Sequence, residues 1–111
     1  MEYQSRLKDT ALDFLFEGVL RLHTREECYR FFEDLCTVGE LHALAQRFQV
    51  AALLHKGATY EQVERLTGMS SATIARINRF LRYGADGYRL VLSRLEAEGM
   101  ATPIDTPIAP S

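Results

Sequence analysis

The segment that decides the fold runs from Thr59 to Arg82 and reads TYEQVERLTGMSSATIARINRFLR. Thr59 is a good N-cap, and Gln62 follows three residues later, which is the spacing of a capping box. Gly68 is the residue type best suited to the left-handed backbone that ends a helix in a sharp turn. The segment therefore predicts two short helices joined by a tight turn.

The second of these helices, over residues 70–82, has an apolar stripe and an outward face of different character. Ser70 is expected to cap it. The apolar stripe, which can pack back on the first helix, consists of Ile74, Ile77 and Leu81. The outward face begins with small side chains and continues with arginines: Ser71, Ala72, Ala75, Arg76, Arg79 and Arg82. Because small side chains allow close approach and the helix carries no acid, the pattern favours a helix-turn-helix whose second helix enters a DNA major groove.

The first helix of the motif contains one residue that departs from this pattern. Val63 and Leu66 share a face and are expected to be buried. Glu64, four residues before the turn glycine, takes a position that is usually small because the two helices cross closely there. Either the crossing is more open or Glu64 leans outward. A plain pair of packed helices with a solvated basic face is the alternative interpretation.

The composition is that of one soluble globular domain. The chain has 111 residues, of which 47% are hydrophobic and 25% charged. It contains no apolar run of about 18 residues, and its polar N-terminus is not a signal peptide, so we expect a cytoplasmic protein without a membrane span. The net charge is −2, but residues 37–83 carry six bases and three acids. Because local charge attracts phosphates, this middle segment favours moderate affinity for nucleic acid.

Four further helices are predicted from apolar residues at helical spacing. They cover about residues 3–22, 25–36, 38–56 and 87–99. The third is apolar on nearly every side from Phe48 to Leu54 and should be the most buried. In the last, Asp86 is expected to be the cap and Val91 to point inward. The remaining residues, 100–111, contain three prolines and predict a disordered tail after a domain over 1–99.

The first helix, over about 3–22, is apolar on more than one side and therefore needs more than one packing partner. A second subunit would satisfy this need, and so would a central position in a monomeric bundle. The dimer is favoured because nearly every helix of this short chain is similarly rich in apolar residues.

No residue pattern predicts a metal site or catalysis. The histidines, His23, His42 and His55, lack metal-ligand spacing, and no nucleophilic triad order or phosphate-binding loop is present. Cys28 and Cys36 lie about two turns apart on one helix, too far for a disulfide, and are expected to be small buried residues. We therefore expect a protein that is not an enzyme and holds neither metal nor cofactor.

Two segments carry a family resemblance. They are LCTVGELHALAQRFQVAALLHKG, over 35–57, and LTGMSSATIARINRFLR, over 66–82. They resemble the Trp repressor family, most closely its YerC/YecD-like branch, and the resemblance extends over roughly residues 5–98. It implies an all-α, six-helix fold that forms an intertwined homodimer. It also implies a transcriptional repressor that presents its paired recognition helices to successive major grooves of a palindromic operator in double-stranded DNA.

The resemblance also implies an effector pocket. In the Trp repressor a threonine and two arginines hold tryptophan, and the matching positions here are Thr37, Arg47 and Arg76. The residue after the recognition-helix arginine is glycine in the Trp repressor, which leaves room for the indole, whereas here it is Ile77. We therefore expect that tryptophan is not bound, and that Ile77 fills the pocket or the pocket accepts another small effector.

The family's DNA-contact positions match the start of the recognition helix. They are Ser70, Ser71, Ala72, Thr73 and Ala75. Arg76 would serve as a structural residue or a phosphate ligand, and Arg79 and Arg82 would contact phosphates, since only the first turns of such a helix reach base edges. A second hypothesis is a helical protein-interaction module that keeps the fold without binding DNA. Glu64 and the net negative charge favour it.

Overall fold

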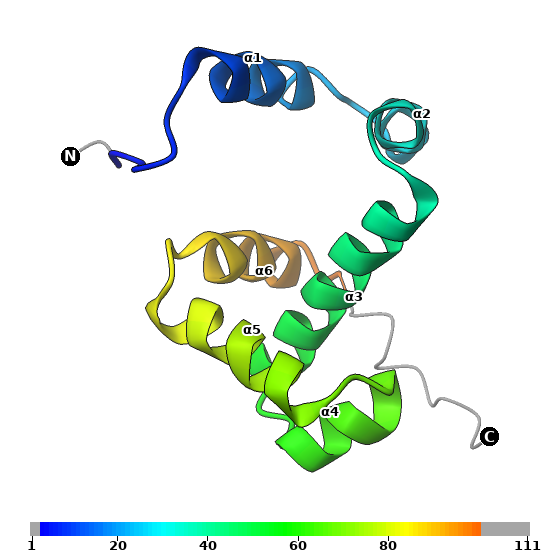
Figure 1. Cartoon of the computed structure of the whole chain (residues 1–111), viewed down its shortest axis with the longest axis vertical. Coiled ribbons are helices and arrows are strands. Elements are labelled where there is room, and N and C mark those ends of the chain that lie inside the picture. Colours follow the sequence, from blue (N-terminus) through cyan, green and yellow to red (C-terminus); the bar gives the residue numbers. More distant parts are fainter. Residues whose placement is uncertain (1–2, 101–111) are drawn as a thin grey trace. The chain divides into compact units, whose positions relative to one another are not determined.

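The structure is a computed structural model of the whole chain, in which residues 3–100 are described (Figure 1). Over that range it consists of six α-helices and contains no strand, which confirms the all-α prediction. The helices are α1 (Thr10–Val19), α2 (Arg25–Leu35), α3 (Val38–His55), α4 (Tyr60–Thr67), α5 (Ser71–Tyr83) and α6 (Gly87–Ala97). The predicted tail lies outside the described residues, apart from Met100. The chain divides into two compact units, Met1–Val38 and Gly39–Ser111.

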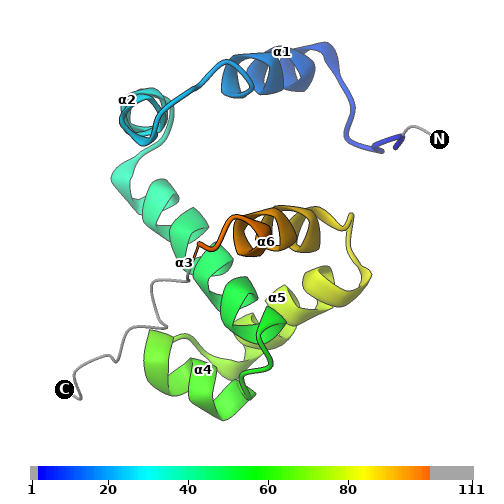
Figure 2. The same cartoon turned by 180° about the vertical axis from the view of Figure 1, so that it is seen from behind.

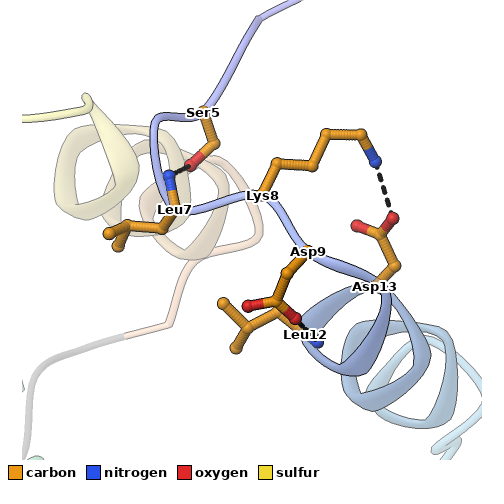
Figure 3. Close-up of polar contacts among 6 residues, drawn as sticks. All are labelled: Ser5, Leu7, Lys8, Asp9, Leu12 and Asp13. Carbon is orange, nitrogen blue, oxygen red and sulfur yellow. Dashed lines mark hydrogen bonds and ion pairs between the residues drawn. The ribbon is translucent and has the colours of Figure 1, made fainter.

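In the N-terminal unit, α1 is shorter at both ends than the predicted helix over 3–22. Figure 3 shows the residues around its start. The backbone N–H of Leu7 donates to Ser5 Oγ at 3.0 Å, and that of Leu12 donates to the Asp9 carboxylate at 2.7 Å. The first bond holds the chain before α1 in a turn, and the second makes Asp9 the N-cap. Short polar side chains can thus hydrogen-bond the backbone in a non-helical conformation. The spacing of apolar residues, which predicted the longer helix, carries no information about such bonds.

The second helix of this unit begins where predicted. Thr24 Oγ1 accepts a hydrogen bond from the Glu27 backbone N–H at 3.1 Å, and the Glu27 carboxylate accepts one from the His23 N–H at 2.7 Å. Cys28 is exposed and Cys36 half-buried, so the expectation of two buried cysteines is wrong. α1 and α2 offer too few neighbouring side chains to cover them.

Apolar side chains of the N-terminal unit remain open to solvent. None of residues 3–38 is buried in this chain. The exposed large apolar residues are Tyr3, Leu7, Phe14, Phe16, Leu20, Tyr29, Leu35 and Val38. This exposure agrees with the sequence prediction that the first helix has more apolar surface than one packing partner can cover.

In the C-terminal unit, α4, α5 and α6 gather around the C-terminal half of α3, as both views show (Figures 1 and 2). The core consists of Val50, Ala51, Ala52, Leu53, Leu54, Val63, Ile74, Ile77, Leu81 and Leu92. Five of these belong to α3, which confirms that the helix predicted over 38–56 is the most buried. Phe48 and Tyr88 extend the core by stacking with ring centroids 6.4 Å apart.

The last helix differs from its prediction in two details. Asp86 precedes α6 with φ +70° and its side chain makes no cap hydrogen bond. Its carboxylate instead pairs with Arg89 Nε, in the first turn of α6, at 2.8 Å. Leu92 is buried, but Val91, which was expected to point inward, is 44% exposed. No helix within residues 3–100 is long and apolar enough to cross a membrane.

Candidate nucleic-acid interface

The first helix of the predicted motif is capped as its sequence indicates. The Thr59 backbone N–H donates to Gln62 Oε1 at 2.9 Å, and the Gln62 N–H donates to Thr59 Oγ1 at 3.1 Å. Both halves of the capping box are therefore formed. α4 ends at Gly68, whose φ of +73° lies in the left-handed region that a side chain would strain. The helix–turn–helix prediction is confirmed at the level of backbone geometry.

The Thr67 side chain stabilises the turn by hydrogen bonds to the backbone before and after it, a role that the sequence prediction missed. Its hydroxyl donates to the Val63 carbonyl at 2.7 Å and accepts from the Met69 N–H at 3.2 Å. Met69 in turn packs against the core. One hydroxyl thus links the end of α4 to the residue that leads into α5. The available signal was a threonine immediately before the turn glycine, a position where side-chain bonds to the preceding turn are common.

The inward face of α4 differs from its prediction by one residue. Val63 is fully buried, but Leu66 is 40% exposed, because Thr67 takes the inward position one turn after Val63. Glu64 is exposed as well. Of the two interpretations of this acid, the outward orientation is therefore correct, and Glu64 does not obstruct the helix crossing.

At the start of the recognition helix α5, the hydroxyls of Ser70 and Thr73 are hydrogen-bonded to each other. Ser70 Oγ accepts a hydrogen bond from the Thr73 N–H at 3.2 Å and donates to Thr73 Oγ1 at 3.0 Å. Ser70 is thus the N-cap, as predicted, and both residues serve the start of the helix. The buried stripe of α5 packs against both neighbouring helices of the unit, α4 and α6.

Burial of that stripe leaves the opposite face of α5 open to solvent. The exposed residues there are Ser71, Ala72, Ala75, Arg76, Arg79 and Arg82. The side chains of Arg76 and Arg79 make no hydrogen bond or ion pair within residues 3–100. Arg82 Nε donates to Asn78 Oδ1 at 3.2 Å. Asn78 was not predicted as a site residue, although its spacing of four from Arg82 was the signal for the contact.

The residues predicted to form an effector pocket occupy three elements. Thr37 is exposed in the N-terminal unit, directly before α3, and Arg47 is exposed on α3. Arg76 is exposed on α5, whereas Ile77 is only 4% exposed and belongs to the core. The side chain that replaces the family glycine is therefore packed among apolar neighbours.

A separate apolar groove lies between α3 and α6. It has a volume of about 620 Å³, and none of the four predicted effector residues lines it. At its rim, His55 Nε2 and Glu96 Oε1 lie 3.2 Å apart. Among residues 3–100 no cluster of three or more histidine, cysteine or acidic side chains could hold a metal ion.

Comparison with known proteins places this geometry in a family. The family model described as Trp repressor protein matches residues 10–96. The chain belongs to the Trp repressor family. The match includes all six helices up to the last residue but one of α6, so the family assignment rests on the whole helical architecture and not on the helix-turn-helix alone.

Similar proteins match this Trp repressor family member over most of its length and most of their own. It is 50% identical over 91 residues to the uncharacterised protein YerC of Bacillus subtilis (strain 168), covering 82% of this chain and 88% of YerC. A crystal structure of a TrpR-like protein from Eubacterium eligens superposes with a TM-score of 0.78 at 47% identity, over 82% of this chain and 94% of that one.

A second crystal structure, of a candidate Trp repressor from Staphylococcus aureus, gives a TM-score of 0.76 at 45% identity. It covers 87% of this chain and 94% of that protein. The resemblance identified from two segments of sequence is therefore confirmed, together with the all-α Trp repressor-like fold. Membership of this family indicates a DNA-binding regulator.

Proposed function

We propose that this protein is a sequence-specific DNA-binding transcriptional regulator, acting as a repressor. Two copies bind a palindromic operator, each through its recognition helix over residues 70–82. The observation that carries the proposal is the exposed face of α5, where small side chains give way to arginines. Two of these, Arg76 and Arg79, have no side-chain partner within residues 3–100. Cations without protein partners on the outward face of a rigidly packed helix are suited to phosphates.

The residues of this face have different roles in the proposal. Ser71, Ala72 and Ala75 are exposed at the start of α5, where they meet base edges in the major groove. Arg79 and Arg82 lie further along the helix and contact phosphates. Ser70 and Thr73 hold the helix start by their mutual hydrogen bonds, so their contribution to DNA binding is mainly to orient it.

A homodimer is the form that we propose for the active protein. The exposed apolar residues of α1 and α2, together with the apolar groove between α3 and α6, supply surfaces for a second copy to cover. Monomeric soluble proteins rarely leave so many large apolar side chains exposed. A two-fold dimer also matches a palindromic operator, because each half-site meets an identical helix.

We further propose that tryptophan does not control this regulator. Ile77 is packed in the core at the position of the family glycine, which supports a site without room for an indole. Titration calorimetry with L-tryptophan is expected to give no heat of binding at micromolar to millimolar concentrations. Saturable binding in the micromolar range would overturn this point while leaving DNA binding untouched.

Selection of bound duplexes from a random pool tests the main proposal. We expect enrichment of a palindromic sequence, and we expect Ser71→Ala to change the preferred sequence with little loss of affinity. Arg79→Ala should weaken all duplexes alike and lower the slope of log K against log salt by about 0.9 per helix. Glu33→Ala, on the exposed polar side of α2, is the control and should change neither property.

A protein-interaction module is the second candidate, and one observation favours it. Glu61 and Glu64 are both exposed on α4, so the helix before the recognition helix presents acids to any partner. Failure to enrich any sequence, combined with no salt-dependent binding to duplex DNA at low salt, would support this candidate and reject the regulator.

A further inference from the structure

We propose that Asn78 is a positioning residue for DNA binding, which acts by holding the guanidinium of Arg82. The inference rests on the proposed function and adds a residue to the recognition helix that no family position suggests. Asn78 is half-buried at the edge of the core-facing stripe of α5, and Arg82 lies one turn further along and exposed. The contact joins Arg82 Nε to Asn78 Oδ1 at 3.2 Å.

The bond determines which donors of the guanidinium stay free. Arginine carries five N–H donors in a planar fork. With Nε–H directed to Asn78, the end of the fork formed by one N–H each of Nη1 and Nη2 has no partner within residues 3–100. That end of the fork binds two phosphate oxygens at once. Asn78 thereby holds a long, flexible side chain in a phosphate-binding orientation before DNA arrives.

Arg79 supplies an internal comparison on the same helix. It is exposed, it carries the same charge, and its side chain has no hydrogen-bond or ion-pair partner within the described range. Arg79 must therefore be ordered when it meets a phosphate, whereas Arg82 is partly ordered beforehand. Because immobilising such a side chain on binding costs free energy, the held arginine should bind more favourably than the free one.

The test is a pair of double-mutant cycles, measured by fluorescence anisotropy on a mixed-sequence duplex of roughly 30 base pairs at low salt, since phosphate contacts dominate there. Asn78→Ala alone should weaken binding about threefold per recognition helix, the lost ordering advantage. In the Arg82→Ala background Asn78→Ala should have no further effect. In the Arg79→Ala background its effect should persist undiminished.

The salt dependence separates positioning from direct contact. Asn78→Ala leaves the number of phosphate contacts unchanged, so the slope of log K against log salt should stay constant, whereas Arg82→Ala should lower it by about 0.9 per helix. Far-UV circular dichroism checks that each variant keeps the helical content of the wild type.

Two outcomes distinguish this inference from the proposal on which it rests. If the wild-type protein binds the duplex but the effect of Asn78→Ala is equal in the Arg82→Ala and Arg79→Ala backgrounds, the positioning role is wrong and the regulator stands. If the wild-type protein does not bind duplex DNA at low salt, both proposals are wrong.

Discussion

The N-terminal and C-terminal units contain apolar residues in similar proportion but place them differently. In the C-terminal unit three short helices surround one end of α3, and ten apolar side chains are buried there. In the N-terminal unit α1 and α2 bury none of the described residues. Helical spacing creates an apolar stripe in both units, but burial requires a second stripe to face it. The contrast supports the proposed homodimer, because the first unit has no core of its own in the single chain whereas the second has one.

The largest predicted effect concerns the exposed apolar surface of the N-terminal unit. Phe14 on α1 is 82% exposed in the single chain. If a second copy covers it, Phe14→Ala removes two buried rings per dimer, at about 1.5–3 kcal/mol each. The dissociation constant of the dimer should therefore rise by about 10²- to 10⁴-fold, which sedimentation equilibrium measures.

A neighbouring polar residue provides the control for this variant. Glu17 lies on the same helix, and within the described range its carboxylate pairs only with Arg21, at 2.7 Å on the surface. Glu17→Ala should leave the dissociation constant unchanged within about twofold. Monomeric behaviour of the wild-type protein, or an equal response to Phe14→Ala and Glu17→Ala, would mean that the exposed face of α1 is not an interface.

The next largest effect concerns the buried stripe of the C-terminal unit. Ile74 is fully buried between helices of its own chain. Ile74→Ala should lower the free energy of unfolding by about 2–5 kcal/mol through lost apolar contacts and a residual cavity. Urea denaturation at fixed protein concentration measures the change, and Ser71→Ala, on the exposed face of α5, should shift it by less than about 0.5 kcal/mol. A small loss for Ile74→Ala would contradict the core placement.

The C-terminal unit was largely predictable from sequence because its signals are local. A capping threonine, a turn glycine and a capping serine specify where α4 begins and ends and where α5 begins, and each acts on backbone groups within about one helical turn. The buried stripe of α5 follows from helical periodicity for the same reason. The outward face of arginines and small residues then follows by exclusion. The amino-acid sequence alone therefore predicts the composition of the candidate interface.

The features that sequence analysis missed depend on details beyond periodicity. Thr67 and Leu66 are both placed to pack inward, and only the hydrogen bonds of the Thr67 hydroxyl decide between them. Asp86 has the residue type of a cap, but its left-handed backbone prevents the bond. The partner of Arg82 depends on a side-chain rotamer, which spacing permits without requiring it. These outcomes depend on one or two hydrogen bonds, each worth about 1 kcal/mol, or on the backbone conformation of a single residue, which is too little to leave a strong sequence pattern.

A smaller predicted effect concerns whether the stability that an N-cap contributes depends on how deeply its helix is buried. Ser70 caps the buried helix α5, and Thr24 caps the exposed helix α2 through one N–H bond each at 3.2 and 3.1 Å. Replacing either by alanine should cost about 1 kcal/mol, because the cap bond involves only the first turn of its own helix. Hydrogen exchange of the first-turn amides measures both. A much larger cost for Ser70→Ala would show that the cap also holds the packing of α5.

The smallest predicted effect concerns the ion pair between Lys8, which precedes α1, and Asp13, in the first turn of α1. Lys8 Nζ lies 2.6 Å from Asp13 Oδ2, and both side chains are about half or more exposed (Figure 3). Exposed pairs of this kind contribute about 0–1 kcal/mol and are screened by salt. Lys8→Ala should therefore lower the free energy of unfolding by less than about 1 kcal/mol in low salt, and by nothing measurable near 1 M NaCl.

A loss of unfolding free energy for Lys8→Ala that persists at high salt would mean that Lys8 stabilises the N-terminal unit by more than its ion pair. Arg21→Ala, which removes the base of another exposed ion pair of the N-terminal unit, is the control and should behave in the same way. If only the Lys8 variant were destabilised at high salt, the lysine stem would be packing against apolar surface. The segment before α1 would then be ordered by contacts that the exposed N-terminal unit of a single chain does not provide, which points again to a second copy.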